Sequence, residues 1–371
     1  MNNKICIYAI CKNEAHFVDK WYESMKEADE IIVVDTGSTD NTLEKLRQYP
    51  KIKVFEKTWE VWRFDEPRNY AMSLASDDVD IFFSTDLDEV LEPGWAKILK
   101  EKWNPEVHTR ASYKYAWSHL PNGEPGRIFH YTKIHNKDWK WLYPVHEILA
   151  RDGNCWHQHS ETLDLFDEIY LHHYPDPTKS RGSYLSLLEL RAKEFPDNDA
   201  YGKLYLAHEY YYRGQYDNCI KMIEQTLLPR IEDYNNLEQA NIFLFLGDAY
   251  SKKQDLKKSI ECWTEAIMTK REYREPYLRL ASYYNEIGLF NLGLAYVEQA
   301  EITSKRLYSW LEQDASWTTV PNDIKAVAHY YLGHYDLAYE YGIDALKYEP
   351  DNTRLLNNLS YYKSKIKQKE E

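Results

Sequence analysis

The sequence predicts an α/β domain built on a mostly parallel sheet, followed by an all-α array of helical repeats. Before residue 178, short apolar segments alternate with helical patterns. After it the strand pattern disappears, and four similar stretches recur every 34 to 45 residues. Strand–helix–strand alternation is typical of parallel sheets with right-handed crossovers. We therefore expect two domains, over residues 1–178 and 179–371, which suits a chain of 371 residues.

The first domain is expected to contain a sheet whose central strands are buried on both faces. In the segment over residues 30–34, the run Ile31-Ile-Val-Val34 is apolar and β-branched on both faces, as in strands inside a parallel sheet. Ligands bind beyond the carboxyl ends of such strands, so residues that directly follow a strand are candidates for a site. The sequence predicts strands over 5–10, 30–34, 52–55 and 79–84, and helices over 15–26, 42–48 and 66–76.

The second domain is predicted from a repeated turn motif. Each copy has a turn residue, then an aromatic residue or leucine, then a small residue; the turn residues are Gly214, Gln254, Gly288 and Gly333. The pattern resembles tetratricopeptide repeats, which are helix pairs of about 34 residues. The longer spacings require insertions. We expect a stacked solenoid closed by a capping helix over residues 353–367.

Composition and charge exclude several classes of protein. The chain has 46 Lys and Arg against 60 Asp and Glu, a net charge of −14, whereas a nucleic-acid binder needs a basic surface. No apolar run approaches the ~20 residues of a membrane span, and no signal-peptide pattern is present. The five scattered cysteines favour reduced thiols. His157 and His159 lack the further spaced ligands of a zinc site. We expect a cytoplasmic protein with neither a transmembrane segment nor a nucleic-acid partner.

Asp86 and Asp88 directly follow the predicted strand over residues 79–84. Neighbouring acidic residues in the sequence add to the repulsion between these carboxylates instead of neutralising it. A divalent cation would relieve that repulsion, and hard oxygen ligands suit Mg²⁺ or Mn²⁺. For the triplet taken alone, a solvated acidic turn is the alternative.

Two other residues occupy positions at which ligands are bound. Asp35 follows the strand over residues 30–34, where its carboxylate would accept a ligand N–H, and Gly37 allows a tight turn after it. Arg68, near the start of a predicted helix, offers a fixed fork of donors for a base or a phosphate. The alternatives are an ordinary strand-to-helix turn and a surface ion pair.

Together these residues resemble the family 2 glycosyltransferases of GT-A fold. The resemblance covers about residues 4–95 and continues more loosely to Tyr174, in a pattern similar to a repeat-carrying subgroup that includes the sublancin-type peptide S-glycosyltransferases. The segments that carry it are Ile10-Cys-Lys-Asn-Glu14, Asp29–Thr42, Arg68-Asn69, Asp86-Leu-Asp-Glu89, Arg127-Ile-Phe129, Val145-His-Glu147 and His172-His-Tyr174.

The resemblance implies a role for each matching residue. The segment from Ile10 to Asn13 and the carboxylate of Asp35 would hold the base, usually uracil, and Asp86 would approach the ribose and a metal. Mn²⁺ or Mg²⁺ would bridge the diphosphate and stabilise the leaving group. The implied nucleotide-sugar-binding residues are Ile10, Cys11, Asn13, Asp35, Arg68, Asp86 and Arg127. The implied metal ligands are Asp88, Asp86 and His173, with His172 as the alternative to His173.

The resemblance also implies an inverting reaction, in which a base takes the acceptor's proton. Glu147 is the first candidate for this base and His146 the second, whereas a structural His–Glu pair is the alternative reading. The Gln-x-x-Arg-Trp segment of processive family members is absent from the sequence. We therefore expect a non-processive enzyme that adds one sugar per event.

The expected substrates are a nucleotide sugar, for which the resemblance implies a UDP sugar, and a protein or peptide acceptor, since repeat arrays present concave surfaces to extended peptides. A surface-polysaccharide or lipid-linked acceptor is the alternative, and the array also suits a homo-oligomer. An inactive GT-A domain serving as a repeat scaffold is disfavoured by the intact Asp35, Arg68, Asp86 and Asp88. A nucleotidyltransferase would need a glycine-rich phosphate loop after the first strand, which the sequence lacks.

Overall fold

The computed structural model describes residues 3–151, 161–176, 182, 184–197 and 199–370. The chain forms two compact units. The first comprises Met1–His119 and Ile128–Phe195, and the second comprises Leu120–Arg127 and Pro196–Glu371. The predicted boundary between residues 178 and 179 lies outside the described residues. The helix after it, α5 (Tyr184–Glu194), belongs to the first unit.

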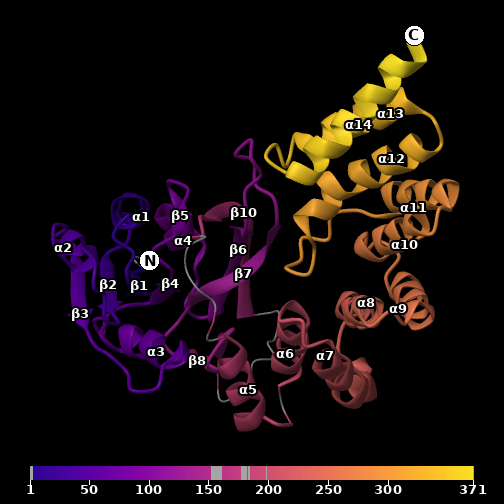
Figure 1. Cartoon of the computed structure of the whole chain (residues 1–371). Helices are drawn as coiled ribbons and strands as arrows, with labels where there is room; N and C mark the ends of the chain where they lie inside the picture. The colour runs from indigo at the N-terminus through magenta and orange to yellow at the C-terminus, as the bar shows by residue number, and fades with distance from the viewer. Residues whose placement is uncertain (1–2, 152–160, 177–181, 183, 198, 371) are drawn as a thin grey trace. The chain divides into compact units, whose positions relative to one another are not determined.

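An eight-stranded sheet forms the centre of the first unit, in the order β3-β2-β1-β4-β7-β6-β10-β5 (Figure 1). The pairs β3-β2, β2-β1, β1-β4 and β6-β10 are parallel, whereas β4-β7, β7-β6 and β10-β5 are antiparallel. The predicted mostly parallel sheet is therefore confirmed. The strands are β1 (Ile5–Cys11), β2 (Glu30–Asp35), β3 (Ile52–Glu56), β4 (Ile81–Ser84), β5 (Glu89–Leu91), β6 (Arg110–Ala116), β7 (Ile128–His135) and β10 (Thr162–His173). A separate hairpin pairs β8 (Lys140–Leu142) with β9 (Ile148–Ala150).

Both faces of the central strands are covered, as their apolar sequences predict. On one face, Ala71 and the indole of Trp141 pack with Tyr8 of β1. On the other face, Trp95 meets Phe83 of β4 edge-on, with ring centroids 5.8 Å apart. The burial of both faces leaves the ends of the strands as the place for polar side chains. The helices of this part are α1 (Val18–Met25), α2 (Thr42–Leu46), α3 (Asp65–Ser73) and α4 (Trp95–Lys102).

The second unit is an array of antiparallel helix pairs, which confirms the predicted repeats. All four predicted turn residues lie between paired helices in the left-handed region, with φ values of 70° at Gly214, 63° at Gln254, 79° at Gly288 and 80° at Gly333. The helices are α6 (Ala200–Tyr212), α7 (Tyr216–Met222), α8 (Asn236–Lys252), α9 (Leu256–Thr269), α10 (Glu275–Glu286), α11 (Phe290–Thr303), α12 (Thr319–Tyr331), α13 (Tyr335–Leu346) and α14 (Thr353–Glu370) (Figure 1).

The long repeat spacings come from two inserted segments. After α7 the chain continues through a π-helical turn (Ile223–Leu227) and a 3₁₀ turn (Leu228–Asp233) before α8 begins. Between α11 and α12 it runs through residues 304–318, which contain a short 3₁₀ turn (Asp314–Trp317). The helix pairs keep their packing because the extra residues lie in the connections between them.

We predict that Gly247→Ala destabilises the second unit. A Cβ at this α8 position would lie 2.6 Å from Cδ1 of Trp263 and 3.1 Å from the carbonyl oxygen of Ser259. Overpacking of this kind costs ~1–3 kcal/mol, more than the gain of ~1 kcal/mol in helix propensity. Chemical denaturation would measure the loss. Gly342→Ala is the control, because its nearest contact, at 3.0 Å, is the flexible end of Leu359. Equal stability of the two variants would contradict the prediction.

Candidate active site

The candidate site lies at the carboxyl end of β4, in the turn that leads into β5. Thr85 donates its backbone N–H to the carbonyl of Tyr8 on the neighbouring strand, at 3.1 Å. The N–H of Glu89 closes the turn by donating to the carbonyl of Asp86, also at 3.1 Å. The turn therefore presents Asp86 and Asp88 from a fixed backbone at the edge of the sheet where ligands bind.

Arg68 joins three parts of the site from the first turn of α3. Its side chain is 7% exposed. Nε donates to Glu147 Oε1 at 2.6 Å, and Nη2 donates to Asp86 Oδ1 at 2.8 Å. Nη1 donates to the hydroxyl of Ser84 at 3.2 Å. Burial alone would lower the pKa of Arg68, but the two carboxylates raise it well above its ordinary value. The structure thus brings together Arg68, Asp86 and Glu147, which the sequence places far apart.

Glu147 is held in place by the backbone before it. His146 adopts a left-handed φ of 48°. Arg191 of α5 donates Nη1 to the carbonyls of Val145 and His146, each at 2.8 Å. The imidazole of His146 lies edge-on to Tyr184, with centroids 5.8 Å apart. Of the two predicted candidate bases, Glu147 is therefore the one that contacts the Arg68 cluster directly.

Lys133 of β7 is a site residue that the sequence analysis missed. Its Nζ donates to Asp86 Oδ2 at 3.1 Å and to Glu89 Oε1 at 2.8 Å. Arg68 and Lys133, which are distant from the turn in sequence, both pair with Asp86, so side chains of the protein already neutralise part of the charge of this acidic turn. Burial alone would raise the pKa of Asp86, but the two cations hold it well below its usual range. The only clue in the sequence is a single lysine among the apolar and aromatic residues of β7.

Asp88 faces His173, the last residue of β10. Asp88 Oδ2 lies 3.4 Å from His173 Nε2, and His173 Nδ1 lies 2.9 Å from the carbonyl oxygen of Trp117. Since a carbonyl only accepts, Nδ1 carries a proton and Nε2 points at Asp88. Burial alone would lower the pKa of His173, but the hydrogen bond and charge of Asp88 raise it. A histidine fixed through Nδ1 to a backbone carbonyl, beside a carboxylate, is a typical donor set for a divalent metal.

The other predicted metal ligands are arranged differently. His172 lies on the opposite side of β10, with Nε2 3.2 Å from Glu92 Oε1 and Nδ1 3.0 Å from His119 Nε2. Both carboxylate oxygens of Asp86 are engaged by Arg68 and Lys133. Within the described residues, no three or more His, Cys, Asp or Glu side chains converge on one metal position. Of the predicted ligands, Asp88 and His173 therefore lie next to each other, and a metal held there would need its remaining ligands from a substrate.

The residues predicted to bind the nucleobase lie together at the ends of β1 and β2. Asp35 is 1% exposed, and its Oδ1 accepts the backbone N–H groups of Gly37 at 2.9 Å and Ser38 at 2.8 Å. The thiol of Cys11 donates to Asp35 Oδ2 at 3.6 Å. Asn13, at a φ of 56°, accepts the N–H of Thr39 on its side-chain oxygen at 2.7 Å. These contacts fix the two strand ends beside each other, as a base pocket requires.

Arg127 is not among the residues gathered at β4. It belongs to the second unit, where its Nη1 donates to the carbonyl of Trp310 at 3.3 Å. His157 and His159 lie outside the described residues. The described cysteines Cys6, Cys11, Cys219 and Cys262 are free thiols.

A buried hydrogen-bond chain below the site predicts a dependence of stability on pH. His135 Nδ1 lies 2.7 Å from the carbonyl of Asn136, so Nε2 accepts the hydroxyl of Tyr8 at 2.6 Å. Burial lowers the pKa of His135 to about 4. In the unfolded chain the ordinary value is ~6.5. The unfolded state therefore takes up a proton first as the pH falls, so this stabilisation is present above pH ~6.5 and is lost progressively towards pH 4.

His135→Gln should flatten the fall in unfolding free energy across this pH range. Urea denaturation at several pH values would measure it, with the half-exposed His16→Gln as the control. A profile that stays as steep in His135→Gln as in the wild type would contradict the assignment.

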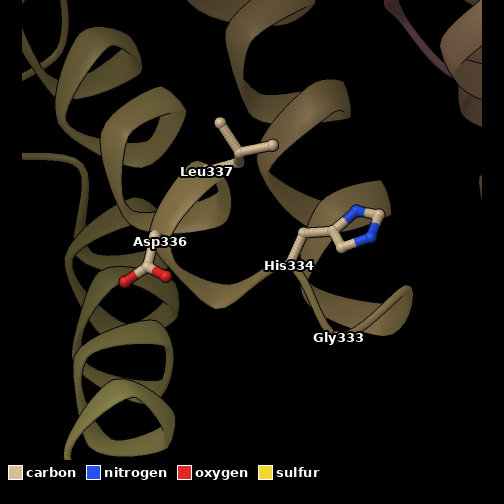
Figure 2. A pocket seen from close by; sticks show the side chains of 4 residues that line it. All are labelled: Gly333, His334, Asp336 and Leu337. Carbon is tan, nitrogen blue, oxygen red and sulfur yellow. The ribbon is translucent and has the colours of Figure 1, made fainter.

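Two surface cavities lie among the described residues of the helical array. One, of about 270 Å³, lies at the α12–α13 turn and is lined by Gly333, His334, Asp336 and Leu337. Figure 2 shows the imidazole of His334 and the carboxylate of Asp336 pointing in different directions, so they do not converge on one ligand atom. The other, of about 250 Å³, lies among α6, α8, α9 and α10 and is lined by Tyr211, Asp248, Ser251, Lys252, Trp263, Arg279, Ser282, Tyr283 and Glu286.

No helix in the described part of the chain combines the length and apolar composition of a bilayer span. Solved structures similar to the helical array include a thermophilic tetratricopeptide-repeat protein, TTC0263, from Thermus thermophilus. The two share 20% identity over 49% of this chain and 88% of that one, with a TM-score of 0.36. The C-terminal part of a repeat protein from Cytophaga hutchinsonii has 18% identity over 50% of this chain and 68% of that one, with a TM-score of 0.38.

Residues 6–150 match the family described as glycosyl transferase family 2. The chain is also 31% identical, over 99 residues, to the lipopolysaccharide core biosynthesis glycosyltransferase LpsC of Rhizobium meliloti (strain 1021). That match covers 25% of this chain and 35% of the relative's length. The matched segment of this chain runs from Cys6 in β1 to the end of β9, and it includes Arg68, Asp86 and Glu147. The match to glycosyl transferase family 2 therefore covers residues 6–150, most of which lie in the first unit.

Proposed function

We propose that the protein is an inverting, metal-dependent, non-processive glycosyltransferase that moves one sugar from a UDP sugar to an acceptor. The observation that carries the proposal is the Arg68 bridge, which joins Asp86 and Glu147 at the carboxyl end of β4. In a domain of this family, the nucleotide sugar and the catalytic base that deprotonates the acceptor would have to meet at that position.

The nucleotide would lie across the ends of β1, β2 and β4. Asp35 would accept an N–H from the base through Oδ2, which the Cys11 thiol contacts only at 3.6 Å. Asp86, fixed by two cations, would accept hydroxyls of the ribose. Asp88 and His173 would hold Mn²⁺ or Mg²⁺, and the diphosphate oxygens would complete the coordination. The bound metal would supply Lewis-acid stabilisation of the departing diphosphate.

Glu147 would act as the base for the acceptor. Arg68 orients its carboxylate through Oε1, and Oε2 has no hydrogen-bond partner among the described residues. That oxygen is available to take the acceptor's proton as the new glycosidic bond forms. His146 is the second candidate.

Incubation with a panel of nucleotide sugars tests the proposal. UDP sugars plus Mn²⁺ should release free UDP and raise the melting temperature, and EDTA should abolish both effects. ADP- and GDP-linked sugars serve as controls for recognition of the nucleobase. If no nucleotide sugar is hydrolysed and none shifts the melting temperature, the enzyme proposal fails and the inactive scaffold becomes the better interpretation.

A protein or peptide acceptor is our first candidate, on the basis of the 250 Å³ cavity in the helical array. Tyr211 and Tyr283 provide apolar walls, and Lys252 and Arg279 provide donors, which together suit an extended peptide. Lys252→Ala combined with Tyr211→Ala should raise the KM for a peptide acceptor and leave acceptor-free UDP release unchanged. The exposed Lys257→Ala is the control. An unchanged acceptor KM would remove the cavity from the proposal.

A glycan acceptor is the second candidate, and the similarity to LpsC favours it, because the name of that relative refers to the lipopolysaccharide core. Mass spectrometry after reaction with a labelled UDP sugar in host lysate would separate the candidates. Label in a protein fraction supports the first candidate, and label in a lipid-linked or polysaccharide fraction supports the second.

A further inference from the structure

Lys133 reaches the acidic turn from β7 and contacts Oδ2 of Asp86, whereas Arg68 contacts Oδ1. Its side chain is 4% exposed, and Nζ lies 5.0 Å from the ring centroid of Tyr131. Burying an ammonium group is costly unless it is paired and hydrogen-bonded. Here the two partners are Asp86 Oδ2 and Glu89 Oε1. Because the ammonium group is buried, it does not serve to keep the protein surface hydrated. Its position is explained by its ion pairs with these two carboxylates.

Glu89 connects Lys133 to the backbone of the turn. The Glu89 side chain is 0% exposed, its Oε1 also accepts the hydroxyl of Tyr115 at 2.9 Å, and its Oε2 accepts the backbone N–H of Asp86 at 2.9 Å. Lys133 thus contacts the Asp86 side chain directly and holds the Asp86 backbone through Glu89. Asp86 is constrained at both points.

The same turn sets the direction of Asp88. In the antiparallel pairing of β5 with β10, the backbone of Glu89 lies opposite that of His173. The carbonyl of Asp88 accepts the N–H of Tyr174 at 2.8 Å. The Asp88 carboxylate reaches His173 only while the turn keeps this register. Without the ammonium group, the buried carboxylate of Glu89 would face the partly exposed carboxylate of Asp86 with only Arg68 left to compensate Asp86, and the remaining repulsion would destabilise the turn.

We propose that Lys133 is a positioning residue of the transferase site: it holds the Asp86–Glu89 turn closed so that Asp86 faces the nucleotide and Asp88 faces His173. Lys133 acts through the two aspartates and does not touch the substrate. The inference rests on the proposed function, because it assigns Lys133 to the binding of a nucleotide and a metal at that site. A residue important only for folding would change stability and leave the metal dependence of the folded protein unaltered.

Calorimetric binding of UDP at increasing Mn²⁺ tests the inference without requiring the acceptor. Lys133→Met should weaken the apparent Mn²⁺ affinity by about 10–100-fold, the usual cost of losing an outer-shell partner. It should raise the KM for the UDP sugar more than it lowers kcat at saturating Mn²⁺. Lys133→Arg should restore most of the affinity because it keeps the charge. Lys114→Met, a lysine of β6 that lies beside Phe166, is the matched control and should bind like the wild type.

A charge-balanced double variant, compared with one of its single variants, keeps the test decisive if Lys133→Met does not fold. Lys133→Met/Glu89→Gln removes both charges, so it should bind Mn²⁺·UDP better than Lys133→Met but less well than Glu89→Gln alone. Equal binding by the double variant and Glu89→Gln, or by folded Lys133→Met and the wild type, overturns the inference. If the wild type itself binds no UDP with Mn²⁺, the proposed function fails instead, so the two failures are distinguishable.

Discussion

Asp88→Ala should abolish metal-dependent turnover while the protein stays folded. Asp88 is one of the two side chains that we propose as metal ligands, so its loss should lower UDP release at saturating UDP sugar by at least about a hundredfold. Its side-chain contact with His173, at 3.4 Å, contributes little to folding, and the turn keeps its backbone hydrogen bonds. Nucleotide release across a Mn²⁺ titration, together with the melting temperature, would measure both effects.

Asp167→Ala is the matched control, because Asp167 is an exposed carboxylate of β10, the strand that carries His173. It should retain wild-type turnover and the same Mn²⁺ dependence. Survival of full activity in Asp88→Ala would mean that the metal lies elsewhere or that the reaction does not need one.

Arg68→Met should cost the first unit about 3–5 kcal/mol of unfolding free energy, the usual effect of removing one partner from a buried ion pair. Methionine fills a similar volume but leaves Glu147 without the only hydrogen-bond donor found for it among the described residues. Lys133 still compensates Asp86, so the loss falls mainly on Glu147 and Ser84. Urea denaturation would measure the change, and UDP release should fall with it.

Arg47→Met tests whether burial is the reason. Arg47 pairs with Glu56, and both side chains are more than half exposed, so this substitution should cost at most about 1 kcal/mol. Similar losses in Arg68→Met and Arg47→Met would show that the Arg68 cluster is no stronger than a surface pair.

The sequence predicts only those parts of the site that depend on neighbouring residues in the chain. The strand ends that carry Asp35, Asp86 and Asp88 follow apolar segments, and these segments form β2 and β4 within one to two residues of the predicted bounds. The position of Lys133 depends instead on the antiparallel pairing of β4 with β7, for which no local signal exists. The sequence alone therefore points to a metal as the partner of Asp86, and not to a lysine 47 residues away.

The repeats show the same division between local and long-range information. Turn chemistry identifies all four turn positions, including Gln254, where a non-glycine residue adopts a positive φ. The unequal spacings predict insertions. They do not predict the π-helical turn at Ile223–Leu227, which depends on how α7 packs against its neighbours.

The division of the chain into units has a consequence for how such proteins diversify. The backbone passes from one unit to the other three times, after His119, Arg127 and Phe195. α5, which precedes the last passage, supplies Arg191 to the carbonyls beside Glu147. Recombination at a single point near residue 178 would remove that arginine and leave the segment Leu120–Arg127 without its partners. Exchange of the array between relatives therefore requires two coordinated grafts, so the two units are expected to be inherited together.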